Sequence, residues 1–148
     1  MVNEYCENVL IQQTMANFLQ EKLGWRVSYA HNKETLGADG TYGRTSYEEV
    51  ILPKQFAAAI KKLNPWLTNE QIREAKKSLT SHLASASLLA INEEKYALLK
   101  DGVAVSYVAA HGERRQRKAQ LIDFDRPENN DFLAVQELKI ASPQFGSR

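Results

Sequence analysis

The apolar residues of this chain change their spacing at Asp101–Gly102, and this change limits the folds that the chain can adopt. Between residues 54 and 100 they recur every three or four positions, which is the spacing of one helix face. After Gly102 they alternate with polar residues, as on one face of a strand. A helical middle followed by mostly antiparallel strands predicts an α/β fold that is α+β in its local order.

Sequence signals at the helix ends support this division. Gly24 is typical of the residue that ends a helix, and Pro53 is suited to the first turn of the next one. Thr68 and Gln71 have the spacing of a capping box. The expected helices cover 3–23, 54–63, 69–84 and 86–100. The first carries an apolar stripe expected to face the core, formed by Ile11, Met15, Phe18, Leu19 and Leu23.

Strands are expected where apolar and polar residues alternate. They cover 25–30, 103–109, 116–124 and 132–140. His111–Gly112 is a turn that joins the second and third of these into a hairpin. Residues 31–46 are rich in glycine and polar residues and predict a long, mobile surface loop. All 148 residues are expected to form one domain, since that length suffices for a hydrophobic core.

The overall charge gives no sign of nucleic-acid binding, because 19 Lys and Arg residues face 18 Asp and Glu residues. Any DNA-binding surface must therefore be local. The predicted hairpin holds such a patch, formed by Arg114, Arg115, Arg117 and Lys118. These cations suit contact with backbone phosphates, or they serve as a charged edge that discourages sheet aggregation. Arg73 and Lys77, on the exposed face of a predicted helix, form a second and weaker candidate.

The sequence also bears on the compartment. Cys6 is the single cysteine, so no internal disulfide is possible. No apolar run approaches the roughly 18 residues that a membrane-spanning helix needs. The first residues are acidic and polar, unlike a signal peptide. We therefore expect a cytoplasmic protein.

Three residues near the C-terminus have the outline of a metal-dependent nuclease motif. Asp123 stands 14 positions before Glu137, and Lys139 follows with one residue between them. On a strand, Glu137 and Lys139 would lie on one face. Carboxylates can hold magnesium, which polarises the phosphate, while a lysine stabilises charge. The pattern is weak by itself, since a quarter of the chain is charged.

Two further residues are metal-ligand candidates. Glu7 falls on or near the apolar side of the first predicted helix. It either interacts with the free amides of the first helical turn or points at a metal site. His82 is expected to be a surface histidine, because no second His or Cys stands at ligand spacing.

Several motifs between residues 7 and 148 resemble those of a known family, the N-terminal region of the restriction (R, or HsdR) subunit of type I restriction-modification enzymes. The most specific is Arg126–Phe132, with the sequence RPENNDF. The supporting motifs are Leu23–Trp25, Leu63–Pro65, Leu99–Val103, His111–Glu113 and Leu121–Phe124, together with Asn92. The resemblance implies a partial restriction-endonuclease-like domain.

In that family the Pro-Glu-Asn-Asn-Asp-Phe string precedes the nuclease motif. The first catalytic carboxylate comes later, in an Arg-Pro-Asp, and a further strand then ends in Glu-Leu-Lys. The resemblance therefore implies that Asp123, Glu137 and Lys139 belong to scaffold strands. No complete catalytic set is then expected in this chain, which would end before the motif. The one functional position that the family suggests here is Glu7, as a carboxylate of the opening helix beside the metal.

The resemblance also implies a larger parent protein. That protein would use magnesium and ATP, translocate and cleave double-stranded DNA, and act with modification and specificity subunits. This chain alone is expected to lack nuclease and ATPase activity, and it has no Gly-x-x-x-x-Gly-Lys-Ser/Thr motif. Two alternatives stay open. One is a self-contained magnesium nuclease that uses Asp123, Glu137 and Lys139. The other is a non-catalytic module that docks DNA or a partner subunit through the cationic patch.

Overall fold

The computed structural model describes residues 8–81, 87–142 and 146–147. The chain divides into two compact units. The first, called the sheet unit, is made of residues 1–52 and 131–148, and the second, called the hairpin unit, is made of residues 53–130. The chain thus leaves the sheet unit after Leu52 and returns to it at Asp131. Each unit is described by itself.

The described part of the sheet unit opens on a helical stretch that is not α-helical over its first six described residues. A π-helix, η1, covers Asn8–Gln13 and continues into α1, Thr14–Leu23. Gly24 ends α1 in the left-handed conformation (φ 68°), as its sequence position predicts. The predicted helix is therefore confirmed over its described part, with wider, π-helical geometry over Asn8–Gln13. The prediction for Glu7 lies outside the described residues.

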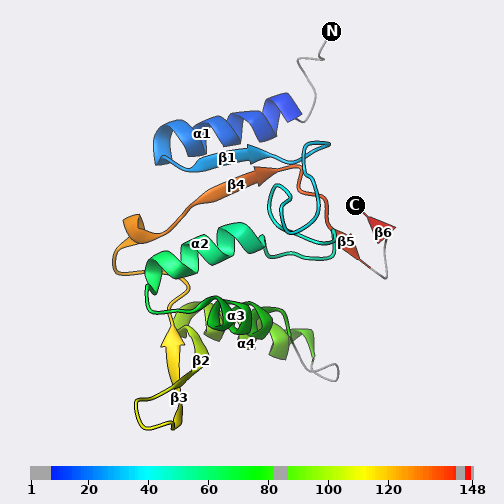
Figure 1. Cartoon of the computed structure of the whole chain (residues 1–148). Coiled ribbons are helices and arrows are strands. Elements are labelled where there is room, and N and C mark those ends of the chain that lie inside the picture. The colour runs from blue at the N-terminus through cyan, green and yellow to red at the C-terminus, as the bar shows by residue number, and fades with distance from the viewer. Residues whose placement is uncertain (1–7, 82–86, 143–145, 148) are drawn as a thin grey trace. The chain divides into compact units, whose positions relative to one another are not determined.

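The strands β1 (Arg26–Tyr29) and β4 (Leu133–Gln136) form a two-stranded parallel sheet. Arg26 pairs with Leu133 at one end of the register, and Tyr29 pairs with Gln136 at the other. The Trp25 and Phe132 rings stack beside the sheet at a centroid distance of 5.0 Å. In Figure 1, α1 runs along this strand pair. Both strands were predicted, but their parallel pairing was not.

The apolar stripe of η1 and α1 does not face a core in the described structure. Ile11, Met15, Phe18 and Leu23 are each more than half exposed, and Ala16 is the buried residue of the helix. The prediction of an inward stripe is therefore wrong for these residues. The physical reason is the narrowness of a two-stranded sheet, which covers only a small part of a helix face.

The segment between β1 and α2 forms neither helix nor strand, as predicted. The prediction that it is a mobile surface loop is wrong in part, because Tyr42 and Arg44 are buried. Gly40 lies so close to the Thr35 carbonyl that a Cβ atom there would stand 2.1 Å from the oxygen. Only glycine fits at that position.

The last predicted strand is shorter than expected. β4 ends at Gln136, because Glu137 takes the left-handed conformation with φ 56°. Glu137 and Lys139 therefore do not lie on a continuous strand, and the two-residue alternation does not apply to them. Two short antiparallel strands follow, β5 (Ala141–Ser142) and β6 (Gly146–Ser147).

The hairpin unit follows its predicted order. Its helices are α2 (Pro53–Leu63), α3 (Asn69–Thr80) and α4 (Leu88–Asp101). The capping box of Thr68 and Gln71 opens α3 as predicted, with both reciprocal bonds formed. α3 ends at Thr80, short of the predicted residue 84, and His82 lies outside the described residues.

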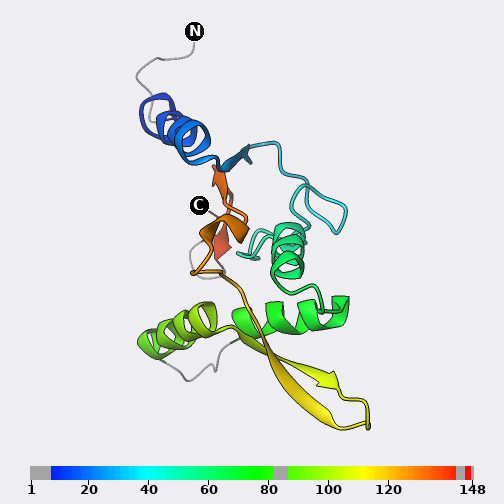
Figure 2. The ribbon, with the colours of Figure 1, turned by 90° about the vertical axis from the view of Figure 1, so that its left-hand side faces the viewer.

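An antiparallel hairpin completes this unit, formed by β2 (Val103–Val108) and β3 (Arg114–Ala119). Its apolar side packs on α2 and α3. The buried cluster is Ile60, Leu67, Ile72, Ala75, Val103, Val105 and Ala119. Gly102 precedes β2 with φ 85°, where a Cβ atom would stand 2.7 Å from the Ala119 carbonyl oxygen. In both views the tip of the hairpin extends beyond α3 (Figures 1 and 2).

The prediction that β3 continues to Phe124 is wrong. The strand ends at Ala119, because the side chain of Asn64 takes the place of a neighbouring strand. The Asn64 side chain donates to the Gln120 carbonyl at 2.7 Å and accepts from the Gln120 amide at 2.9 Å. Residues 121–126 then run without regular structure to the 3-10 helix η2, Pro127–Asn129.

α4 covers the hairpin unit less completely than α2 and α3. It has no buried residue, and Leu88, Leu89 and Tyr96 are each more than two thirds exposed. Leu98 contacts the core, and the Lys95 ammonium donates to the carbonyls of Ser78 and Ser81. α4 is thus fastened at its inner side and presents apolar residues outward.

Candidate functional site

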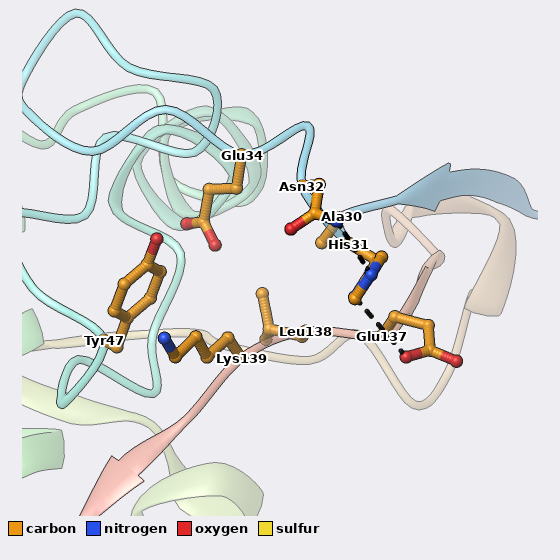
Figure 3. Close-up of a pocket in the computed structure, with 8 residues that line it drawn as sticks. All are labelled: Ala30, His31, Asn32, Glu34, Tyr47, Glu137, Leu138 and Lys139. Atoms are coloured by element: carbon orange, nitrogen blue, oxygen red, sulfur yellow. Dashed lines mark hydrogen bonds and ion pairs between the residues drawn. The ribbon is translucent and has the colours of Figure 1, made fainter. Parts of the chain in front are cut away.

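A cavity of about 520 Å³ lies in the sheet unit at the carboxyl ends of β1 and β4. Because the two strands are parallel, the segments that follow them leave the sheet at the same edge. In open α/β sheets this is the edge where ligands bind. Figure 3 shows the lining residues: Ala30, His31, Asn32, Glu34, Tyr47, Glu137, Leu138 and Lys139.

A buried ion pair fixes one wall of the cavity. The Arg44 guanidinium donates to both carboxylate oxygens of Glu34, at 2.8 and 2.6 Å. It also donates to the carbonyls of Glu49 (2.8 Å) and Lys139 (3.0 Å). The exposed fractions of the paired side chains are 0% for Arg44 and 4% for Glu34. The hydrogen bond to Glu34 raises the pKa of Arg44, against the opposing effect of burial.

This ion pair has two consequences for the site. Glu34 is already bonded through both oxygens, so its negative charge is matched by Arg44. The bond from Arg44 to the Lys139 carbonyl also fastens the segment after β4 to the segment after β1. A backbone bond from the Ala141 amide to the Tyr47 carbonyl, at 2.9 Å, adds to this attachment.

Lys139 and Glu137 diverge from one another. The Lys139 ammonium lies 4.6 Å from the centroid of the Tyr47 ring, a cation–π contact. The Glu137 carboxylate lies 3.9 Å from Nδ1 of His31. Figure 3 shows the Lys139 side chain directed toward Tyr47 and the Glu137 side chain directed toward His31. The expectation that both lie on one strand face is therefore wrong, because Glu137 ends the strand geometry.

His31 is held from two sides. The Asn32 amide nitrogen lies 2.9 Å from His31 Nε2, and Glu137 faces the other ring nitrogen. Asn32 and Glu137 both have positive φ, 53° and 56°, and each follows a strand of the sheet. Asn adopts this conformation more readily than most residues, but for Glu137 it costs about 1–2 kcal/mol. Strain of this kind concentrates at functional sites.

Besides the Glu34 carboxylate, which Arg44 matches, the cavity offers the Glu137 carboxylate, the His31 imidazole and the Lys139 ammonium group. A catalytic magnesium site draws on several carboxylate oxygens. Within residues 8–81, 87–142 and 146–147, no group of three or more His, Cys, Asp or Glu side chains is placed to hold a metal ion. The described residues of the cavity therefore support binding of a polar group, and they do not complete a metal centre.

Asp123 belongs to the hairpin unit and has a structural environment. It is 6% exposed, and its carboxylate accepts hydrogen bonds from the Asn129 side chain (2.7 Å) and the Arg126 amide (2.9 Å). Asn130 bonds the Asp123 backbone on both sides, at 2.8 Å each. The bond from Asn129, followed by that from Arg126, lowers the pKa of Asp123.

These bonds form what we call the Asp123 knot, made of Asp123, Arg126, Asn129 and Asn130. Three of its four residues, Arg126, Asn129 and Asn130, belong to the RPENNDF string, which is the most specific sequence motif. Glu137 and Lys139 belong to the other unit. The nuclease hypothesis built on Asp123, Glu137 and Lys139 stays a prediction, and the metal role of Glu7 also stays one.

All four cations of the predicted patch, Arg114, Arg115, Arg117 and Lys118, lie on β3 and are exposed. Arg115 pairs with Glu113 at 2.9 Å. The Arg117 guanidinium carbon lies 4.3 Å from the centroid of the Trp66 ring. Arg73 and Lys77 are exposed on α3. The DNA-binding role of these six cations stays a prediction.

Sequence patterns did not indicate the most buried polar groups. The Glu34–Arg44 pair lies in a segment without regular spacing, and the Asn64 contact joins residues 56 positions apart. The RPENNDF string carries a signal for the Asp123 knot, because Asn side chains favour hydrogen bonds to nearby backbone groups.

A family model described as "Type I restriction enzyme R protein N terminus" matches residues 4–148. The type I restriction enzyme HindI endonuclease subunit of Haemophilus influenzae is 33% identical over 142 residues, which cover 96% of this chain and 13% of that protein. A putative type I restriction enzyme MjaIXP endonuclease subunit of Methanocaldococcus jannaschii is 31% identical over 134 residues.

The second alignment covers 90% of this chain and 12% of the relative. The chain thus spans only 12–13% of the length of these two relatives. No solved structure matches it. Among the described residues, no helix is long and apolar enough to cross a membrane.

Proposed function

This chain belongs to the family of type I restriction enzyme R protein N termini, and on that premise we propose that it forms the leading part of a DNA endonuclease domain. Both relatives are named as endonuclease subunits, and they align with nearly the whole chain. The sheet unit would supply the scaffold next to the reacting groups, and the cavity at its carboxyl edge would face the nucleic acid.

The whole R subunit would cleave double-stranded DNA with magnesium after ATP-driven translocation. It would act in the cytoplasm in a complex with modification and specificity subunits. The 148 residues here would neither bind ATP nor cut DNA alone. The sequence supports the proposal that these residues do not bind ATP, since it contains no phosphate-binding loop ending in Gly-Lys-Ser/Thr.

The Asp123 knot is the observation that supports the proposal that this chain alone does not cut DNA. A carboxylate that holds magnesium needs free oxygens directed at the ion. Both oxygens of Asp123 instead accept hydrogen bonds from the chain a few residues downstream. Asp123 thus closes a turn, and a metal would have to displace Asn129 and the Arg126 amide to reach it.

The test is magnesium-dependent cleavage of supercoiled plasmid. We expect none from the purified chain. In the assembled restriction complex, an R subunit with Glu137→Ala or Lys139→Ala should cleave at close to the unaltered rate, because neither residue would touch the reacting phosphate. Magnesium-dependent cutting by the isolated chain that disappears in Glu137→Ala would overturn the proposal.

The same assay decides on the self-contained nuclease. That alternative requires cutting by the isolated chain that Asp123→Asn, Glu137→Ala and Lys139→Ala each abolish. Circular dichroism of every variant would separate loss of chemistry from loss of folding. Asp123→Asn needs this control most, because the change removes a negative charge that two donors solvate.

A further inference from the structure

We propose that the outer side of β3 is a docking surface for the sugar-phosphate backbone of double-stranded DNA. The choice of DNA rests on the proposed function. The surface is defined by Arg114, Gln116 and Lys118, which alternate with Arg115 and Arg117 along the strand. It lies in the hairpin unit and is separate from the cavity of the sheet unit.

Side chains of α3 cover the outer edge of β2, so β3 is the strand of the hairpin whose edge is left open. α3 occupies the outer edge of β2, where the Gln71 side chain donates to the Ser106 carbonyl at 2.8 Å. The Glu74 carboxylate accepts from the Ser106 amide at 3.1 Å and from the Ser106 hydroxyl at 3.0 Å. These bonds satisfy the amide and the carbonyl of Ser106, which β2 would otherwise offer to another strand.

The register then fixes which groups of β3 face outward. Ser106 lies opposite Gln116, and its amide is bonded to Glu74 rather than to β3. In an antiparallel pair such positions alternate with hydrogen-bonded ones. The amides of Arg114, Gln116 and Lys118 therefore point away from β2. Backbone amides and basic side chains are both common phosphate ligands.

Two of the four cations are bound within the hairpin unit. Arg117 lies over the Trp66 ring, and Arg115 pairs with Glu113. The Trp66 contact anchors the middle of β3 to the helical body, which keeps the strand in a defined orientation. Arg114 and Lys118 have no ion pair among the residues that the structure describes, and both side chains are exposed. They are the cations free to meet a partner.

The spacing of these two cations fits a regular polyanion. Four residues along an extended strand separate Arg114 from Lys118 by about 14 Å. DNA carries one charge per strand about every 3.4 Å of its axis, so the two cations would meet different phosphates. A charged edge also discourages sheet aggregation, but that role predicts no affinity for DNA.

The experiment measures binding of the full chain to a fluorescent 20-base-pair duplex between 50 and 200 mM salt. Each phosphate contact contributes about −0.9 to the slope of log K against log salt. Arg114→Gln with Lys118→Gln should therefore flatten the slope by about 1.8. Over this salt range the unaltered chain should lose about tenfold more affinity than the double variant. Two duplexes of unrelated sequence should bind alike, because backbone contacts carry no sequence information.

A matched control removes the same charge elsewhere in the hairpin unit. Lys62→Gln with Lys100→Gln alters two exposed helix residues and should leave the slope unchanged. Equal slopes for the unaltered chain and the β3 variant would overturn the proposal, as would an equal effect of both pairs. Absence of DNA binding at 50 mM salt would overturn it too, and would favour an acidic protein surface as the partner of β3.

Failure here is distinguishable from failure of the proposed function. If the β3 variant binds DNA normally and the isolated chain still does not cut, the docking surface is wrong and the endonuclease proposal stands. Cutting by the isolated chain would reject that proposal whatever the salt slopes show. Thermal unfolding of both double variants would confirm that they fold.

Discussion

Different kinds of buried side chain stabilise each of the two units of this chain. In the hairpin unit, seven apolar residues from α2, α3, β2, β3 and the α2–α3 connection form one buried cluster. In the sheet unit, the described buried side chains are two alanines, Tyr42 and Arg44, with Glu34 almost buried beside them. A segment without periodic apolar residues can therefore still have a fixed centre, provided that its buried polar groups bond one another.

The largest effect should come from breaking that polar centre. Arg44→Met leaves the Glu34 carboxylate buried without its partner and removes the bonds to the Glu49 and Lys139 carbonyls. Breaking one side of a buried pair typically costs about 3–5 kcal/mol. Each unit has one tryptophan, Trp25 or Trp66, so denaturation in the Trp66→Phe background reports on the sheet unit.

An exposed ion pair of the same unit serves as the control for Arg44→Met. Arg26 pairs with Asp131, and the Arg26 side chain is 59% exposed. Arg26→Met should therefore cost no more than about 1 kcal/mol. If both arginine variants shift the Trp25 transition equally, burial of Arg44 is not what stabilises this unit.

A somewhat smaller effect is expected from a cavity in the apolar cluster. Leu67 is 1% exposed and lies between α2 and α3. Leu67→Ala removes buried methyl groups and should cost about 3 kcal/mol in the unfolding of the hairpin unit. The measurement is urea denaturation followed by Trp66 fluorescence in the Trp25→Phe background. Leu67→Ala should also be measured in the Trp66→Phe background, and a larger shift of the Trp25 transition there would show that Leu67 does not belong to a core of the hairpin unit alone.

The smallest effect concerns pH. The hydrogen bond from Asn129 holds the pKa of Asp123 below its ordinary value of 3.8. The folded state therefore binds the Asp123 proton less readily than the unfolded state. The resulting stability is present above about pH 4 and is lost as pH falls through the lower folded pKa.

Asp123→Asn should remove this part of the acid sensitivity of the hairpin unit. The measurement is the urea midpoint from Trp66 fluorescence at pH 5 and pH 3. At neutral pH the variant is expected to be less stable than the parent, and the difference should narrow at pH 3. If the urea midpoints of variant and parent differ by the same amount at pH 5 and pH 3, protonation of Asp123 is not linked to unfolding.

Apolar spacing located most of the hairpin unit. Repeats of three and four residues marked α2 and α3, and the capping box of Thr68 and Gln71 marked the start of α3 correctly. The switch to alternation after Gly102 located β2. These signals succeed because they depend on residues close in sequence, whose packing partner is the common core.

Apolar spacing did not predict burial or strand ends where these depend on groups distant in the sequence. The stripe of α1 has helical period, but a two-stranded sheet gives it too little surface to bury. The end of β3 depends on Asn64, and the end of β4 depends on the backbone of Glu137. Neither Glu34 nor Arg44 stood out in the sequence, because a buried ion pair has no characteristic spacing. The cavity could not be predicted, since the pairing of β1 with β4 defines its edge.

The pairing of β1 with β4 also sets an order of events during synthesis. β1 is made early, yet its partner is complete only when residue 136 has left the ribosome. The hairpin unit ends at residue 130 and can fold first, as domains generally do when their own chain is available. Its folding brings residues 53 and 130 into one compact body, which shortens the loop that must close between the strands. Prior folding of the hairpin unit thereby lowers the entropy cost of pairing β1 with β4, although the unit interrupts the sheet in sequence.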